Sequence, residues 1–435
     1  MTRSRFIRRV AAVGSLALVA GLAACSTPSD SDDSGGSGES AAPAPGVTDT
    51  EVVVGTHHPL TGEAAAGYST ISAATTAYFE YLNENGGING RSIEYIVKDD
   101  GYNPANTSTL TRELVLDDEV FAVLNGLGTP PHSAVIDYLN DTEVPDVFVA
   151  SGSPTFNQPE DYPYTFGFNT NYVVEAKILA TYAQETFPDK VYCLMAQDDD
   201  LGEDFEKGLL SVLGDDGLAT TQVYSVANRD VAAQVAAMKA AGCEVNFLAA
   251  INAFSAISIG TAAKLAYQPQ WVAASIGGDY NTVSTYLGDV GPALLEGFVS
   301  ANYLPSHFNM DDPWTAHFYE INEKYNGGAP FDGNTVYGMS VAYLFAEALA
   351  QAGETPTRES LLAALTSGEL VGNAIVPISL SETNHGAYSG AQITTVTGGI
   401  QEYVGTPFTT GTGDEPVEAY DGGPVPFENE GIPVP

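Results

Sequence analysis

The stretch from residue 120 to residue 156 constrains the fold of this chain more than any other. Phe121–Asn125 and Val144–Ala150 are short apolar runs, and Ser133–Asn140 between them carries apolar side chains at helical spacing. A strand, a helix and a strand in this order make the two strands parallel. Each strand is followed by a turn of small residues, Gly126–Pro130 and Ser151–Pro154. Ligands of open parallel sheets bind beyond the carboxyl ends of strands, so these turns indicate a polar cradle, although such residues also form ordinary turns.

The same alternation of strands and helices runs along most of the chain. Before this unit we expect strands at 51–55 and 93–98 and helices at 69–85 and 104–117. From residue 169 the pattern starts again, with strands at 190–196, 221–226, 245–250 and 270–274 and helices at 173–185, 205–213, 231–241 and 254–266. Two α/β domains, each a doubly wound parallel sheet, are therefore predicted.

The last third of the chain contains three long helical patterns, at 314–325, 335–352 and 358–366. Because such helices need a sheet to cover, we expect them to return to the first domain, which would make that domain discontinuous. Short strands at 391–396 and 400–403 follow. An acidic, Pro- and Gly-rich tail with little core content is expected at the end.

The N-terminus has the pattern of a targeting signal. A basic segment with four arginines precedes the short apolar run Val10–Ala20, which is too short to span a membrane. The run ends in Leu22-Ala23-Ala24-Cys25, which resembles the bacterial lipobox and implies cleavage before Cys25 and a lipid on that cysteine. A plain secretory signal is the alternative. Residues 26–46 are rich in Ser, Asp, Gly and Pro and are expected to be a disordered tether.

The chain is strongly acidic, with 15 Lys and Arg against 55 Asp and Glu and a formal net charge of -40. Such a field argues against nucleic acid or anionic lipid as a partner. A salty exterior medium would screen the self-repulsion, and an acidic surface also keeps an exported protein soluble. Both interpretations stay open.

Two cysteines, Cys193 and Cys243, follow the signal. In an exported protein they could form a disulfide, or each could be a small buried apolar residue within or beside a strand. No Cys and His spacing indicates a metal site. The acids Asp198–Asp200 and Asp204 lack the spacing of an EF-hand loop and are better explained as an acidic turn that opens a helix.

Motifs of the common hydrolases and nucleotide-binding enzymes are missing. The closest string to a nucleophile elbow, Gly338-Met339-Ser340-Val341-Ala342, lies inside a helical pattern and lacks the second glycine. There is no Walker-type loop and no dinucleotide-binding glycine motif. An enzyme is therefore disfavoured, and neither a catalytic residue nor a cofactor nor a metal is predicted.

Several segments together resemble the solute-binding proteins of bacterial ABC importers, of the branched-chain amino-acid type with a type I periplasmic binding fold. They are Val54–Gly62 (VGTHHPLTG), Tyr81–Gly101 (YLNENGGINGRSIEYIVKDDG), residues 126–153, and Gln197–Leu209 (QDDDLGEDFEKGL). The resemblance implies two lobes joined by three crossovers, near residues 167–169, near residues 300–303 and after about residue 371. Lobe 1 would comprise 47–168 and 303–371, lobe 2 would comprise 169–302 and 372–410, and the tail 411–435.

The resemblance also implies a ligand site in the cleft between the lobes. In the first lobe it points to Leu127, Gly128, Thr129, Ser151, Gly152 and Ser153, whose hydroxyl and N–H groups would hold a carboxylate. In the second lobe it points to Leu201, Asn252, Phe254, Ser275 and Asp279. The carboxylate that amino-acid binders place directly after strand 270–274 is missing here, and Asp279 is the first acid that follows. His57 and His58 lie in the first strand-end loop, where His58 could touch the ligand or be solvated.

Taken together, these features predict an exported lipoprotein, anchored through Cys25 to the outer face of a bacterial membrane. It would bind an amino-acid-like or carboxylate-bearing solute as a monomer and deliver it to an ABC permease with its ATPases. The alternative is a receptor module that senses a solute and docks on another partner.

Overall fold

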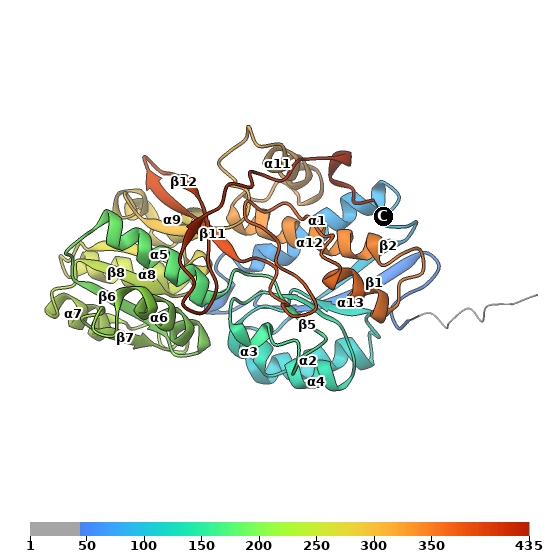
Figure 1. Cartoon of the computed structure of the whole chain (residues 1–435), viewed down its shortest axis with the longest axis horizontal. Coiled ribbons are helices and arrows are strands. Elements are labelled where there is room, and N and C mark those ends of the chain that lie inside the picture. The colour runs from blue at the N-terminus through green and yellow to red at the C-terminus, as the bar shows by residue number, and fades with distance from the viewer. Residues whose placement is uncertain (1–43, 435) are drawn as a thin grey trace, which may run out of the picture. The chain divides into compact units, whose positions relative to one another are not determined.

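The computed structural model describes residues 44–434, so the expected signal, Cys25 and most of the tether lie outside the described residues. Two twisted sheets, each with helices on both faces, make up this part of the chain (Figure 1). The predicted fold class, doubly wound α/β with two lobes, is confirmed. We call the body around the five-stranded sheet the first lobe and the body around the eight-stranded sheet the second lobe.

The sheet of the first lobe consists of five parallel strands in the order β2-β1-β3-β4-β5. Their bounds are β1 Glu51–His58, β2 Ser92–Asp99, β3 Ala122–Leu124, β4 Asp146–Val149 and β5 Thr165–Gly167. One face packs on α1 (Ser69–Glu84), α11 (Pro313–Tyr325), α12 (Gly333–Gln351) and α13 (Arg358–Thr366). The other face packs on α2 (Pro104–Leu116) and on the segment with α3 (Thr129–Ser133) and α4 (Ile136–Asp141). The three C-terminal helices thus return to the first sheet, as the sequence predicts; Figure 1 shows α12 beside α1.

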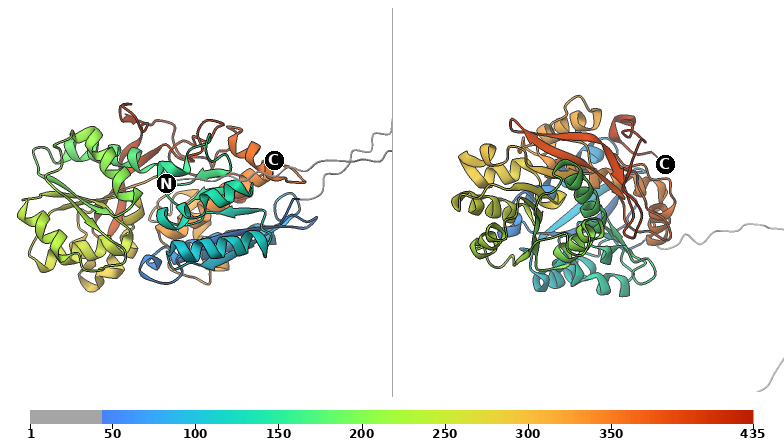
Figure 2. Two further views of the ribbon diagram at one scale, coloured as in Figure 1. Left: turned by 90° about the horizontal axis from the view of Figure 1, so that it is seen from below. Right: turned by 60° about the vertical axis from the view of Figure 1, so that its left-hand side comes forward.

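The sheet of the second lobe has the order β13-β12-β11-β10-β9-β8-β6-β7. Its parallel part contains β6 (Tyr192–Gln197), β7 (Thr221–Tyr224), β8 (Val245–Ala249), β9 (Gln270–Ala273) and β10 (Val299–Asn302). Antiparallel strands β11 (Gly390–Thr397), β12 (Ile400–Thr409) and β13 (Glu418–Ala419) extend it from β10. Helices α5 (Tyr172–Thr186) and α6 (Asp200–Leu213) cover one face. Helices α7 (Ala232–Ala240), α8 (Asn252–Lys264) and α9 (Tyr280–Leu287) cover the other, with the short α10 (Gly291–Leu294) beside α9 (Figure 2).

The chain passes between the two lobes at three places. The first passage leads from β5 to α5, and the second leads from β10 through residues 303–312 to α11. The third leaves α13, and residues 374–388 add buried side chains to the first lobe's core before β11 enters the second sheet.

Aspartates cap several helices of this fold and thereby fix where these helices begin. Asp199 accepts a hydrogen bond from the backbone N–H of Leu201 at 3.0 Å, so α6 starts at Asp200, inside the stretch expected to be an acidic turn. Asp279 caps α9 and Asp332 caps α12 in the same manner. The last two caps lie at the site described below.

Cys193 on β6 and Cys243 before β8 are joined by a disulfide, with their Cα atoms 5.8 Å apart. Their sulfur atoms lie in the core between the sheet and α7 and α8. Of the two arrangements that the sequence left open, the structure contains the bridge.

The C-terminal tail contacts both lobes, which differs from the expectation that it contributes little to a core. The ammonium group of Lys177 on α5 donates to the carbonyl oxygens of Gly411, Gly413 and Glu415 at 2.7 to 2.9 Å. Further along, Phe427 packs edge-on against Trp314, with ring centroids 5.0 Å apart, and the first lobe's core extends to include it. The acidic, Gly-rich composition of the tail does not predict these contacts, because most of them involve main-chain atoms.

Across residues 44–434, none of the helices has both the length and the apolar character needed to cross a bilayer.

Candidate functional site: a pocket between the two lobes

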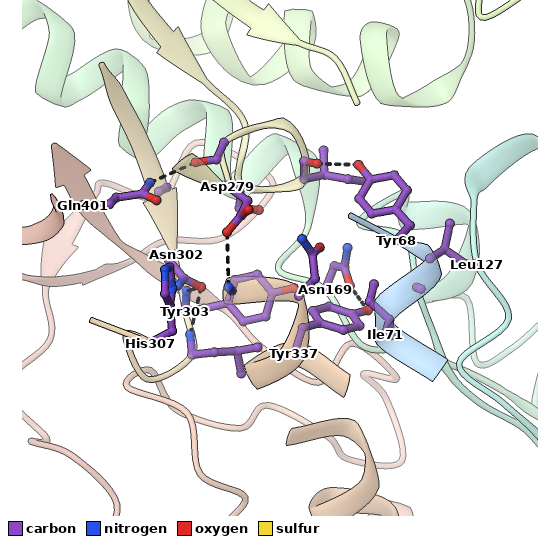
Figure 3. A pocket seen from close by; sticks show the side chains of 18 residues that line it. Tyr68, Ile71, Leu127, Asn169, Asp279, Asn302, Tyr303, His307, Tyr337 and Gln401 are labelled. Carbon is purple, nitrogen blue, oxygen red and sulfur yellow. Dashed lines mark hydrogen bonds between the residues drawn. The ribbon is translucent and has the colours of Figure 1, made fainter. Parts of the chain in front are cut away.

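A pocket of about 730 Å³, its open mouth included, lies where the two lobes meet (Figure 3). The first lobe contributes Tyr68 and Ile71 at the start of α1, Leu127 and Ala150 after β3 and β4, and the first turns of α12. The second lobe contributes the segment after β9 and Gln401 of β12. Asn169 and Ala301–Leu304 belong to the passages between the lobes. A solute in this pocket would therefore touch both lobes and two of the segments that join them.

Asp279 links the two lobes at the edge of this pocket. Its carboxylate accepts the N–H of Thr282 at 2.8 Å, which caps α9 in the second lobe. It also accepts the N–H of Gly333, the first residue of α12 in the first lobe, at 3.2 Å. Asn252 orients the same turn by accepting the N–H of Asp279 at 3.4 Å. The carboxylate thus receives N–H groups from the N-termini of two helices and still faces the pocket (Figure 3).

Two further titratable groups lie beside Asp279. Burial raises the pKa of Asp332, the cap of α12, to about 7, and the nearby charge of Asp279 adds to this shift. Burial lowers the pKa of His307, although the charge of Asp279 opposes that change. His307 therefore stays a neutral imidazole at neutral pH, and its Nε2 atom lies 3.1 Å from Nδ2 of Asn281.

A third carboxyl group lies behind Ser275. Glu175 on α5 is fully buried, and it accepts the hydroxyl of Ser275 at 3.0 Å and also its backbone N–H. Burial raises the pKa of Glu175 to about 7, because the two hydrogen bonds from Ser275 offset only part of the cost of desolvation.

The remaining walls are aromatic and amide side chains. Tyr68 donates its hydroxyl to the carbonyl oxygen of Ile276 in the other lobe. Tyr337 donates to Oδ1 of Asn169 at 2.7 Å, and Asn302 accepts the N–H of Tyr303 at 2.8 Å. Burial raises the pKa of Tyr303 and Tyr337 well above the usual range, so both remain neutral phenols.

Three of the residues predicted for the site line this pocket: Leu127, Ser275 and Asp279. Asn252 does not line the pocket, but its side chain accepts a hydrogen bond from the backbone N–H of Asp279.

The hydroxyl cradle predicted after β3 and β4 is present, but two tyrosine side chains pack against it and most of it does not line the pocket between the lobes. Thr129 and Ser151 are buried, and their hydroxyls bond each other at 2.7 Å. A Cβ atom on Gly128 would lie 2.4 Å from the ring of Tyr102, and one on Gly152 would lie 2.6 Å from the ring of Tyr172. Ser153 donates toward Asp200 across the lobes at 3.4 Å. These two tyrosines therefore pack against Gly128 and Gly152, while Ser151, Gly152 and Ser153 also line a separate pocket of about 990 Å³, its open mouth included.

Leu201 and Phe254 are both fully buried in the second lobe. Phe254 stacks on Tyr224 with ring centroids 4.3 Å apart, so its face is already covered. Neither residue lines the pocket between the lobes.

The two histidines expected in a strand-end loop belong instead to β1, where both are fully buried. Nε2 of His58 donates a hydrogen bond to the carbonyl oxygen of Asn125 at 2.8 Å, because a carbonyl oxygen can only accept. His57 lies in a buried chain with His132 and two aspartates. Thus His58 is neither solvated nor in the pocket.

Most of the polar lining comes from residues that the sequence did not single out. Asn302 and Tyr303 fall within an expected crossover, and Gln401 is on an expected strand. Tyr68 is the N-cap residue directly before α1, and Asn334 and Tyr337 are on α12. Helical periodicity could have flagged Tyr68 and Tyr337 only as core residues. His307 stands in a connection that carries no motif.

Two lobes around separate parallel sheets, three connecting passages and a pocket between them define a two-lobed binding protein with the type I periplasmic binding fold. A family model described as periplasmic binding protein matches residues 51–400, and the chain belongs to this family. The resemblance found in the sequence is thereby confirmed. Membership implies an extracytoplasmic location and a role in binding a solute.

Solved structures of similar fold include proteins of ABC transporters. A branched-chain amino acid ABC transporter protein from Thermus thermophilus with bound valine is 22% identical, with a TM-score of 0.74 over 83% of this chain and 97% of that one. A solute-binding protein of an ABC transporter from Rhodopseudomonas palustris BisB5, in complex with 3,4-dihydroxy benzoic acid, is 22% identical, with a TM-score of 0.68 over 80% of this chain and 94% of that one. A fatty acid ABC transporter substrate-binding protein from Thermomonospora curvata is 22% identical, with a TM-score of 0.70 over 87% and 98%. At these identities the likeness concerns the fold. A search of curated protein sequences finds no match.

Proposed function

We propose that this protein captures a small organic solute in the pocket between its lobes and delivers it to an ABC permease. The observation that carries the proposal is the lining of the pocket, which comes from both lobes and from the segments that join them. A solute that touches both lobes stabilises the closed state by its differential affinity for that state. The closed form is then the shape that a permease recognises.

The proposal includes the predicted export and anchoring. Cleavage before Cys25 and lipidation of that residue would hold the protein at the outer face of the membrane, and residues 26–43 would let the body reach the permease. Of the predicted contacts, Leu127, Ser275 and Asp279 are proposed to touch the solute. The other predicted residues of the cleft would support its walls.

The test combines binding and shape. The purified protein is screened by thermal shift against amino acids, carboxylates, amines and amides, since a ligand that binds only the folded state raises the melting midpoint. X-ray scattering with and without each hit then measures the radius of gyration. We expect a hit to raise the midpoint and to reduce the radius. A hit that leaves the radius unchanged would contradict capture by closure, and a screen in which no compound binds would contradict capture itself.

A receptor module that senses a solute is the second reading that the sequence allows. Such a module would bind its solute in the same pocket but would dock on a different partner protein. Crosslinking of the lipidated protein in its native membrane distinguishes the two: recovery of permease subunits supports import, and recovery of a signalling protein in their place contradicts it.

A further inference from the structure

The chemistry of the pocket points to a class of solute that differs from an acid. This inference rests on the proposed function, because it names the ligand of the same pocket. Three features carry it: the sign of the charges around the pocket, the state of the N–H groups that could hold a carboxylate, and the nature of the remaining walls.

The charges around the pocket are negative. Asp279 lines it, Asp332 lies beside Asp279, and Glu175 lies directly behind Ser275. Within residues 44–434, no lysine or arginine side chain lines the pocket. The pKa of Asp332 and that of Glu175 are both about 7, so each carries part of a negative charge near neutral pH, and the N-termini of α9 and α12 together contribute about one positive charge. A carboxylate in the pocket would therefore meet an uncompensated negative field, and a cation would be attracted by it.

Four N–H groups of the turns after β3 and β4 are already in use. After β3, the N–H of Leu127 donates to the carbonyl of His57 and that of Gly128 to the carbonyl of Ala150. After β4, the N–H of Ser151 donates to the carbonyl of Val149 and that of Ser153 to the hydroxyl of Ser151. The hydroxyls of Thr129 and Ser151 bond each other, and of the cradle residues only Leu127 lines the pocket, so these hydroxyls are not part of the pocket's lining.

The rest of the lining suits an apolar or aromatic body. Tyr68, Tyr303 and Tyr337 present rings to the pocket, and Ile71, Leu127 and Leu304 present aliphatic side chains (Figure 3). Tyrosine rings also attract a positive charge placed over their faces. The accepting atoms, by contrast, concentrate at Asp279, whose two oxygens each accept one N–H and retain a further lone pair.

We propose that the pocket binds a cationic nitrogen compound, an amine on a small apolar or aromatic body without a carboxylate, whose ammonium group pairs with Asp279. The compounds compared below carry apolar parts of two sizes. The charge of their polar group is the property that the pocket selects.

Matched compounds test this proposal. Leucine is compared with 3-methylbutylamine, which lacks its carboxylate, with 4-methylpentanoate, which lacks its amine, and with the neutral 4-methylpentanamide. Phenylalanine, 2-phenylethylamine, 3-phenylpropanoate and 3-phenylpropanamide form the aromatic series. Affinities for the purified protein are measured by calorimetry at pH 7.5. We expect an amine to bind at least tenfold more tightly than the acid, the amino acid and the amide of its series.

The outcomes separate the ligand class from the function. Tighter binding of an acid, an amino acid or an amide overturns the class while capture of a solute stands. No binding by either amine also overturns the class, and the other compounds then decide whether capture survives. A series in which nothing binds contradicts both.

A variant locates the charge that matters. Asp279→Asn keeps a good helix cap and removes the negative charge, so the empty protein should melt within about 2 °C of the parent. The affinity of the amine should fall at least tenfold. Asp312→Asn makes the same change at the cap of α11, outside the pocket, and should leave the affinity unchanged. Equal amine affinity in Asp279→Asn and the parent would overturn the pairing with Asp279.

Discussion

The Nε2 atom of His57 lies 2.9 Å from the Nδ1 atom of His132 in the interior of the first lobe. The other ring nitrogen of each histidine lies 2.8 Å from a carboxylate oxygen. Nδ1 of His57 contacts Oδ2 of Asp100, and Nε2 of His132 contacts Oδ2 of Asp146. All four side chains are fully buried. The four side chains are therefore joined in one continuous chain of polar contacts.

Because the chain acts as a unit, we predict that its two histidines are energetically coupled. His57→Gln should destabilise the protein by about 3 kcal/mol, since it leaves a buried carboxylate poorly paired. His132→Gln should cost a similar amount. The double variant should lose less than the sum of the two single losses, by about 1 kcal/mol or more. Urea unfolding of the four proteins at pH 7 measures this coupling, and losses that add to within about 0.4 kcal/mol would show independent histidines.

Gly126 packs directly on the contact between these histidines. A Cβ atom there would lie 2.4 Å from Nδ1 of His132 and 2.6 Å from Nε2 of His57. We predict that Gly126→Ala destabilises the protein by about 2 kcal/mol, because the two rings must separate. Gly260→Ala, inside α8, is the matched control: its Cβ meets only a terminal methyl group of Leu287 at 3.2 Å. The control should be neutral or slightly stabilising by thermal melting, since alanine favours a helix. Equal melting midpoints for both variants would contradict the packing argument.

The raised pKa of Asp332 predicts a pH-dependent cost. Its folded-state pKa is about 7, above the value of about 3.9 expected in the unfolded chain. The folded state therefore binds more protons between these values, and stability declines as the pH rises through that window. Asp332→Asn keeps the cap of α12 and removes this cost.

We expect the free energy of unfolding of Asp332→Asn to exceed that of the parent by about 1 kcal/mol or more at pH 8, with the difference fading toward pH 4. Denaturant unfolding across this range checks the prediction. Asp312→Asn should show no comparable gain at pH 8. A constant difference at all pH values would mean that titration of Asp332 is not its origin.

The disulfide gives a further prediction. Cys193 and Cys243 are separated by 50 residues. In the entropic account, closing a loop of this size raises the free energy of the unfolded chain by about 4 kcal/mol. The double variant Cys193→Ala/Cys243→Ala should therefore melt well below the oxidised parent and close to the reduced parent. If reduction of the parent leaves its melting midpoint unchanged, the bridge contributes little to stability.

The parallel strands and their helices follow from local patterns. The apolar runs before Gly126 and Ser151 became β3 and β4, and the period of the helices at 69–85 and 335–352 matches α1 and α12 to within two residues. Several short elements were not predicted, among them α9 and β10. Helix α9 begins at Tyr280 with a mixture of polar side chains, and β10 is only four residues long. Both depend on neighbours: α9 on its Asp279 cap and its packing on α8, and β10 on the strands that flank it.

The site was less accessible to sequence reasoning. The family resemblance pointed to Leu127 and Asp279, and both line the pocket. The packing of Tyr102 and Tyr172 against the hydroxyl cradle could not be foreseen, since these residues come from two different lobes and contact the cradle only in the fold. Adjacent histidines at the end of β1 suggest a polar loop. They are buried because their partners lie 43 residues or more away in the sequence.

The tail's anchors are almost all main-chain carbonyl oxygens. Those of Gly411, Gly413 and Glu415 receive Lys177, and those of Val425 and Gly431 receive Trp314 and Tyr78. Every residue type has such an oxygen, so most positions of the tail can change identity without loss of an anchor. A single residue inserted or deleted between Glu415 and Val425, however, would displace the carbonyl groups on one side of the change relative to those on the other. For this segment natural variation should therefore be free in composition and strict in length.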